Sequence, residues 1–276
     1  MKETVNLRQV QLAETDILRE AVKLCERHGL RYAMIGGTML GAVRHRGFIP
    51  WDDDIDIALP REDYERFLQY AREELPSPYQ LLTHNGKHPC MYAKIHNTDT
   101  TFIEASVVGH KEYYKGVFID VMPLDGLPEN EKKRRRHQRR IGALVKAFTW
   151  HRFGFGGCKT WKAKLCYLIP EKWIFKRWDR LCKRYEFDSS TYTSYTWTYR
   201  CKRFTFLTEH FRETADYAFE YLTVKGAKDF DRYLTTHFGD SYMQLPPEEA
   251  RQSHSSDGGV IDLEQSYLAY GELKEV

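Results

Sequence analysis

The sequence predicts an α+β fold in which a mixed sheet is flanked by helices and the C-terminal half is largely helical. Three observations predict this class. The chain opens with apolar residues at helical spacing. Short apolar runs bounded by glycine, proline and aspartate then mix with helical patterns up to residue 128. From Glu129 onward helical patterns dominate. We therefore expect a core, 1–128, and a mainly helical region, 129–276, packed on it, with a flexible tail after about residue 252.

Helices and strands alternate in the predicted N-terminal region. Residues 7–28 carry an apolar helical face, and Gly29 is the kind of residue that commonly ends a helix. Pro60 favours the first turn of a second helix that continues to Glu74. Between them the pattern predicts a strand at Tyr32–Ile35, a glycine turn, a short helix at Thr38–Arg46, a loop at Gly47–Trp51 and a strand at Asp54–Leu59.

The later elements are predicted from the same kinds of pattern. Strand-like runs lie at 79–82, 91–95, 101–103 and 116–121, and Pro123–Gly126 is typical of a turn that closes this half. Helical patterns cover 129–153, 159–168, 171–185 and 229–238, with a glycine joint at 154–157. The segment 188–199, rich in threonine and tyrosine, is compatible with either loop or strand.

Composition excludes several classes of protein. Of the 276 residues, 42% are hydrophobic and 29% charged, as in soluble globular proteins. No apolar run approaches the roughly 18 residues of a membrane span, and the polar N-terminus is unlike a secretory signal. The six cysteines form no CxxC pair, which argues against zinc and a disulfide framework. A net charge of +3 is too small to imply nucleic-acid binding. We expect a cytoplasmic protein.

A dense group of carboxylates is the strongest functional signal. Asp52, Asp53, Asp54 and Asp56 lie within five positions and precede an apolar run. Because side chains alternate along a strand, Asp54 and Asp56 are expected to point the same way and to repel each other. A cation between them would relieve that repulsion, and carboxylate oxygens select Mg²⁺ or Mn²⁺. Asp120, in the apolar run VFIDVM, is a third acid whose charge would be costly to bury alone.

A glycine turn precedes the acids. Gly36, Gly37 and Thr38 follow an apolar strand and open a helical pattern, and N–H groups at a helix N-terminus can bind phosphate. A phosphate site beside paired carboxylates is typical of phosphoryl or nucleotidyl transfer.

The stretch GGTMLGAVRHRGFIPWDDDIDI resembles the signature of the LicD family, which includes the fukutin-related proteins. Three further stretches also resemble motifs of this family: YAKIHNTDTTFIE, VFIDVMPLDGLP and FGDSYMQLPP. The resemblance therefore covers most of the chain except about 132–203. It implies a nucleotidyltransferase-like fold that moves a phospho-alcohol, often phosphocholine, from a CDP-activated donor such as CDP-choline to a sugar hydroxyl, releasing CMP. The implied acceptor is a cell-surface glycan, such as lipopolysaccharide or teichoic acid, or its lipid-linked precursor.

Site roles can now be assigned. We expect Asp54, Asp56 and Asp120 to be both catalytic residues and ligands of Mg²⁺ or Mn²⁺; Asp120 could also take the proton of the attacking hydroxyl, and the alternative is a structural role as a cap or in a salt bridge. The expected substrate-binding residues are Gly36, Gly37, Thr38, Arg44, Lys94 and Trp51. Arg44 and Lys94 would contact phosphate. Trp51 would cover a base or an alkylammonium group, or simply pack the loop.

Two features leave alternatives open. The run Lys132–Arg140 is either a solvated helix face or a contact for an anionic membrane or glycan at the inner face of the membrane. Abundant aromatic residues would suit a cage for quaternary ammonium, but abundance does not locate one.

The expected activity is metal-dependent transfer of a phospho-alcohol, with choline, ribitol or another polyol as the alcohol. The alternatives are a nucleotidyltransferase that uses the same acids and a catalytically silent scaffold for glycan assembly.

Overall fold

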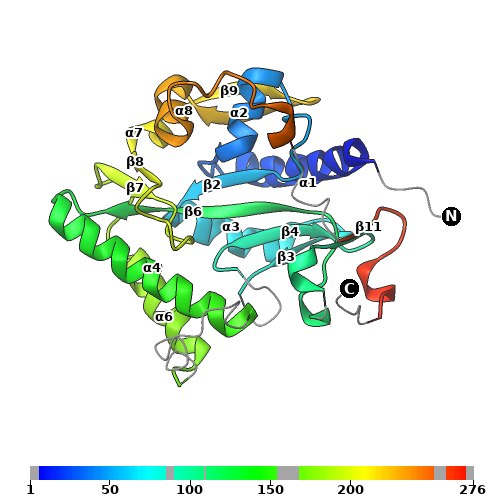
Figure 1. Ribbon diagram of the computed structural model, residues 1–276, viewed down its shortest axis with the longest axis horizontal. Coiled ribbons are helices and arrows are strands. Elements are labelled where there is room, and N and C mark those ends of the chain that lie inside the picture. The colour runs from blue at the N-terminus through cyan, green and yellow to red at the C-terminus, as the bar shows by residue number, and fades with distance from the viewer. Residues whose placement is uncertain (1–5, 85–89, 109, 154–167, 252–258, 272–276) are drawn as a thin grey trace.

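A seven-stranded mixed sheet runs through the centre of the protein in a computed structural model that describes residues 6–84, 90–108, 110–153, 168–251 and 259–271 (Figure 1). Its main strands lie in the order β1 (Ala33–Met34), β2 (Asp56–Pro60), β6 (Phe118–Leu127), β4 (Ala93–Asn97) and β3 (Tyr79–Leu82). Only β2 and β6 pair in parallel; the other pairs are antiparallel. The α+β prediction is confirmed.

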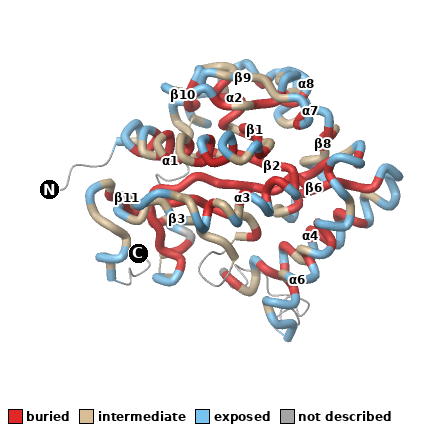
Figure 2. Tube along the Cα trace, turned by 180° about the vertical axis from the view of Figure 1, so that it is seen from behind, coloured by how far each residue is buried: buried red, intermediate tan, exposed pale blue. Residues whose placement is uncertain are grey.

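The central strand β6 is longer than predicted. All ten of its residues are buried (Figure 2), so the expected turn at Pro123–Gly126 is wrong. The strand continues because Asp125 is neutralised inside the protein: Arg61 donates two hydrogen bonds to its carboxylate, at 2.6 and 2.8 Å. Beyond its pairing with β2, β6 pairs with β7 (Tyr192–Ser194), which pairs with β8 (Thr205–Leu207).

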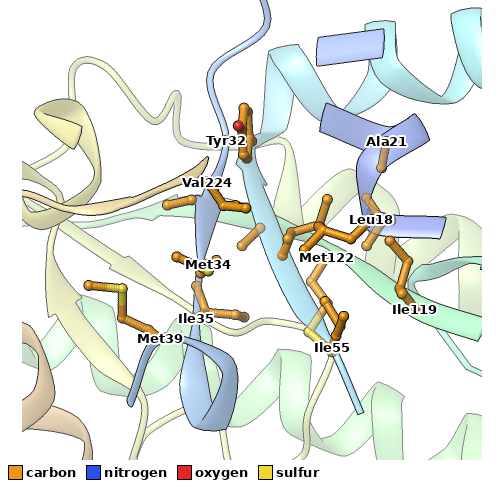
Figure 3. Close-up of a cluster of buried hydrophobic side chains, with 14 of the residues drawn as sticks. Leu18, Ala21, Tyr32, Met34, Ile35, Met39, Ile55, Ile119, Met122 and Val224 are labelled. Atoms are coloured by element: carbon orange, nitrogen blue, oxygen red, sulfur yellow. The ribbon is translucent and has the colours of Figure 1, made fainter. Parts of the chain in front are cut away.

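Helices α1 (Leu7–Arg27) and α3 (Arg61–Glu74) pack on each other and on β6. A capping box at Asn6 begins α1, as its polar start requires. Figure 3 shows Leu18 and Ala21 of α1 and Ile119 of β6 among the side chains of one continuous apolar core. Met34 and Val224 lie in the same core, where β1 meets β10 (Leu222–Ala227).

The second half of the chain contains more helix than strand, but it also holds strands that sequence analysis did not identify. Helices α4 (Glu131–Phe153) and α6 (Glu171–Cys182) pack together below one end of β6 in Figure 1. The short helix α7 (Glu209–Arg212), the hairpin of β9 (Thr214–Phe219) and β10 (Leu222–Ala227), and α8 (Phe230–Phe238) follow. Near the end, β11 (Val260–Asp262) pairs with β5 (Thr101–Ile103), so this part of the expected flexible tail is ordered in the structure.

Several predicted boundaries shift. Helix α2 (Gly36–His45) begins at the glycine turn rather than at Thr38, and β2 begins at Asp56, so Asp54 precedes the strand. The domain division at 128 remains a prediction, although β6 links the two sides through β7. The predicted helix at 159–168 lies almost wholly outside the described residues, and the glycine joint at 154–157 lies entirely outside them.

Two compositional expectations can be compared with the described parts of the chain. No helix there is both long and apolar enough to cross a lipid bilayer. The described cysteines that are recorded as free thiols are Cys25, Cys90, Cys182 and Cys201.

Candidate active site

Three charged side chains form a row across the central sheet. Asp120 on β6 is directly opposite Asp56 on β2 and Lys94 on β4. Residues opposite each other in neighbouring strands point to the same face, so the row is fixed by strand register. The alternate positions Ile57 and Ile119 are fully buried in the apolar core. The sheet therefore holds acids on one face and apolar packing on the other.

A cavity of about 330 Å³ opens at the start of β2. Asp54 and Asp56 both line it, together with Gly36 and Gly37 at the N-terminus of α2. Asp52 contributes a third carboxyl group. The structure thus brings the predicted glycine turn and two of the three predicted metal ligands to one place. Asp54 lies in the segment before β2, so the alternation of side chains along a strand, which we expected to place it beside Asp56, does not explain its position.

The two glycines allow the acids to come close to the helix. Gly36 has a φ of +56°, and a Cβ there would lie 3.4 Å from Asp56 Oδ2. A Cβ at Gly37 would lie 2.6 Å from Asp52 Oδ2, closer than real side chains tolerate. The Gly36 N–H donates a hydrogen bond of 2.8 Å to Tyr233 Oη. A phosphate at this turn would therefore be bound by the N–H groups that follow Gly36, at the positive end of α2.

The acids of the cavity repel one another. Burial, and then the charges of Asp52 and Asp120, raise the pKa of Asp54 to about 7. Burial, and then Asp54, raise the pKa of Asp56 well above its usual range. The pKa of Asp52 rises to about 6, mainly through burial and then through the charge of Asp53. These carboxyl groups are not all ionised at neutral pH unless a cation joins them.

Lys94 pairs directly with Asp120 and acts more weakly on Asp54 and Asp56. The side chains of Lys94 and Asp120 are buried and form an ion pair, and Lys94 Nζ lies 3.7 Å from the centre of the Phe118 ring. Burial alone would lower the pKa of Lys94, but Asp120 raises it above its usual value, so the lysine stays charged. Burial raises the pKa of Asp120, and Lys94 partly offsets that rise. Among the described residues, Asp54 and Asp56 have no such direct ion pair, and burial and the neighbouring acids raise their pKa values despite the charge of Lys94.

Asp54 and Asp56 fit a magnesium site that substrate completes. Within the parts of the chain that the structure describes, no three histidine, cysteine, aspartate or glutamate side chains are arranged to hold a metal ion by themselves. Mg²⁺ commonly binds through one or two carboxylates together with substrate phosphates, rather than in a cage made only of protein ligands. Asp54 and Asp56 beside a helix N-terminus match that kind of site.

Four of the predicted substrate-binding residues do not line the cavity: Lys94, which pairs with Asp120, and Thr38, Arg44 and Trp51. Thr38 is buried, and its hydroxyl accepts a hydrogen bond of 2.8 Å from Asp56 N–H, so it positions β2 against α2. Arg44 donates to the carbonyl groups of Tyr242 and Gln244, at 3.0 and 3.2 Å. Trp51 packs against the core with the Arg251 guanidinium 5.4 Å from its ring.

Sequence reasoning missed one acid near the site. Glu14 on α1 is fully buried, and neither carboxyl oxygen has a hydrogen-bond partner among the described residues. Burial, and then the charges of Asp54 and the neighbouring acids, raise its pKa well above the usual value, which favours the protonated form. Its position in the sequence is the missed signal, because Glu14 lies at helical spacing from the core residues Val10, Ile17 and Leu18.

Sequence reasoning also missed the aromatic side chains of the cavity. Tyr195, Trp197 and Phe204 come from the region between β7 and β8, and His237 and Phe238 come from the end of α8. Only tertiary folding brings these residues beside the acids, which lie more than a hundred positions earlier in the chain.

Comparison with known proteins adds independent findings. Residues 29–142 match the family model described as LicD/FKTN/FKRP, nucleotidyltransferase domain. The chain is 30% identical over 273 residues to the lipopolysaccharide cholinephosphotransferase LicD of Haemophilus influenzae, covering 91% of this chain and 96% of the relative. It is also 47% identical over 45 residues to the human ribitol 5-phosphate transferase FKRP, which is 16% of this chain and 9% of that protein.

Proposed function

The chain belongs to the LicD family of phosphotransferases, and we propose that it transfers a phospho-alcohol from a CDP-activated donor to a hydroxyl group of a cell-surface glycan or its precursor. Two relatives, named for cholinephosphate and ribitol 5-phosphate transfer, support a phospho-alcohol as the transferred group. Phosphocholine is the first candidate, because the relative named for it aligns over 91% of this chain. A glycan acceptor is supported by the lipopolysaccharide named in that relative.

One observation carries the proposal. Asp54 and Asp56 line a cavity at the N-terminus of a helix, and burial and their mutual repulsion raise their pKa values more than the charge of Lys94, which is paired with Asp120, lowers them. A helix N-terminus attracts phosphate, and paired carboxylates attract a divalent cation. The cavity therefore combines the two kinds of binding group that transfer of a phosphoryl group requires.

We assign the metal-binding role for Mg²⁺ or Mn²⁺ to Asp54 and Asp56, with Asp120 beside them in the strand register. A bound divalent cation supplies neutralisation of the negative charge on the donor phosphates. The first-turn N–H groups of α2 after Gly36 orient the diphosphate. Asp120, kept close to Lys94, takes the proton of the acceptor hydroxyl, and the adjacent positive charge of Lys94 keeps Asp120 ionised enough to do so.

The acceptor is proposed to approach from the side of α4. Most basic residues of the run Lys132–Arg140 are exposed there, while Arg134 donates hydrogen bonds to the carbonyl groups of Pro128 and Glu129. Arg135 pairs with Glu131 at 2.5 Å on the same helix, which leaves the remaining charges available to an anionic membrane or glycan.

The decisive experiment incubates the protein with CDP-choline, CDP-ribitol and CDP-glycerol in the presence of Mg²⁺ and a glycan acceptor, and measures both CMP and the mass of the product. CMP release with an acceptor heavier by a phospho-alcohol is the expected result. An acceptor heavier by a nucleoside monophosphate would indicate a nucleotidyltransferase instead. No turnover of any donor, with intact binding of glycan-assembly proteins, would indicate a silent scaffold.

A further inference from the structure

The cavity that holds Asp54 and Asp56 has an aromatic wall, which we define as Tyr195, Trp197, Phe204 and His237. The rings of Tyr195 and Trp197 are stacked with their centroids 5.6 Å apart. The ring of Phe204 lies 5.4 Å from that of Tyr195 and 5.2 Å from that of His237. These spacings make the wall a continuous surface of packed rings.

Hydrogen bonds connect the aromatic wall to the glycine turn. The hydroxyl groups of Tyr195 and Tyr233 share a hydrogen bond of 2.7 Å, and Tyr233 Oη lies 3.2 Å from His237 Nδ1. The same Tyr233 hydroxyl accepts the hydrogen bond from Gly36 N–H. The wall is therefore held in a set position relative to the helix N-terminus that we assign to phosphate.

The charge of the cavity favours a cation. Three aspartates line it, and no lysine or arginine is among its described lining residues; Arg203 lies beside the wall, with its guanidinium 5.7 Å from the centre of the Phe204 ring. His237 does not change this balance, because burial lowers its pKa to about 4 and it is neutral at pH 7. Aromatic faces attract cations. A quaternary ammonium group has no hydrogen-bond donor, so it needs no polar partner in the wall. A polyol would instead lose the hydrogen bonds that its hydroxyl groups make with water.

The distance between wall and acids is short. The position of a Cβ on Gly36 would be 3.4 Å from Asp56 Oδ2 and 3.9 Å from His237 Cε1. Only a small gap thus separates the Asp56 carboxylate, which we assign to the metal, from the ring of His237. An alcohol whose cation is joined to its phosphate by a short linker fits this arrangement.

We propose that the aromatic wall binds the quaternary ammonium group of the transferred phospho-alcohol and selects choline over uncharged polyols. The proposal rests on the proposed function and adds the class of alcohol. The same rings could instead stack on the pyrimidine base of the donor, and the experiment below separates the two.

The test measures binding by calorimetry, with Mg²⁺ present, for three compounds: phosphocholine, CMP and 3,3-dimethylbutyl phosphate. The last is the carbon isostere of phosphocholine, which keeps the phosphate and lacks the positive charge of the ammonium group. Trp197→Leu removes a ring from the wall, and Trp197→Phe retains one. Trp173→Leu on α6 is the matched control, because Trp173 is 62% exposed and is not a lining residue of the cavity. Thermal unfolding of each variant checks that it is folded.

The expected result is that Trp197→Leu weakens phosphocholine binding by about 2- to 30-fold, the range of one cation–π contact. Trp197→Phe and Trp173→Leu should bind nearly as wild type, and affinity for CMP should be unchanged in all variants. Wild type should bind phosphocholine more tightly than the isostere that lacks the ammonium charge. Equal binding of the two compounds, or an equal loss of CMP affinity in Trp197→Leu, would overturn the proposal.

The donor panel distinguishes failure of this proposal from failure of the proposed function. Transfer of ribitol phosphate or glycerol phosphate in preference to phosphocholine would overturn the ammonium site and leave phospho-alcohol transfer in place. Binding of phosphocholine that depends on Trp197, in a protein that turns over no donor, would support the ammonium site and reject the transfer reaction.

Discussion

Replacing Lys94 with methionine should destabilise the protein through the acid that it leaves behind. Methionine keeps most of the side-chain length beside the Phe118 ring but removes the charge that pairs with Asp120. Both partners are nearly inaccessible, with Lys94 4% and Asp120 7% exposed. Breaking a buried ion pair by removing one partner costs about 3–5 kcal/mol. For a chain of this size, that loss lowers the melting temperature by roughly 6–20 °C.

The loss in Lys94→Met should depend on pH in a defined direction. Without Lys94, the pKa of Asp120 in the folded protein rises further above its value in the unfolded chain, which is about 3.9. A group with a raised pKa contributes its full stability below the unfolded pKa and loses it as the pH rises through the folded pKa. The deficit relative to wild type should therefore be small near pH 4 and larger at pH 8. Thermal unfolding at both values measures it.

Two further variants make this prediction sharp. Lys94→Met combined with Asp120→Asn removes both charges and should recover much of the lost stability, since a neutral pair has no uncompensated ion. Lys225→Met is the control, because Lys225 pairs with Asp216 at 3.0 Å on the exposed hairpin, where an ion pair contributes only about 0–1 kcal/mol. A single variant as stable as wild type at pH 8, or a double variant no better than the single, would refute this reasoning.

Three other predictions address the site and its surroundings. Asp54→Asn should abolish transfer and the Mg²⁺ dependence of donor binding while keeping or raising the melting temperature, because it relieves repulsion; normal turnover would remove Asp54 from the site. Because the pKa of Glu14 is raised in the folded protein, its contribution to stability is lost as pH rises above about 4.5. Glu14→Gln should remove this pH-dependent loss; identical pH profiles of wild type and variant by thermal unfolding would contradict this. Arg139→Gln with Arg140→Gln should slow transfer to a membrane-borne anionic acceptor at low salt but not hydrolysis of donor by water, and the difference should shrink as salt rises; equal transfer rates would indicate a solvated helix face.

The acid cluster could be predicted from sequence because its signal is local. Asp54 and Asp56 stand next to an apolar run, and Asp120 interrupts another, so the cost of placing charges there is visible without a structure. Strand register then aligns Asp56 with Asp120, which a local pattern cannot specify. The pairing of Lys94 with Asp120 depends on the same register. The sequence identified Lys94 as a candidate cation without identifying the acid beside it.

Other features could not be predicted because tertiary contacts decide them. The hairpin β9–β10 lacks the usual glycine or asparagine signal, and Glu220 takes a φ of 55° in its turn. Arg8 and the Phe48 N–H both bind the Glu220 carboxylate, and these contacts come from distant parts of the chain. Similarly, Asp125 is read locally as a turn residue, although Arg61 makes it a buried strand residue. Local propensity is overridden wherever a distant partner satisfies a charge.

The division of the cavity between two parts of the chain has an evolutionary consequence. Its acids and glycine turn come from positions 36–56, whereas most of its aromatic wall comes from 195–204. Thr196 contacts the Asp125 carboxylate of β6, so this later segment is anchored to the sheet independently of the side chains on either side of it. Mutations at Trp197 or Phe204, unlike those at Tyr195, whose hydroxyl is hydrogen-bonded to Tyr233, can therefore accumulate without displacing the acids. Descendants of one ancestral enzyme could acquire different alcohols while inheriting the same phosphate chemistry.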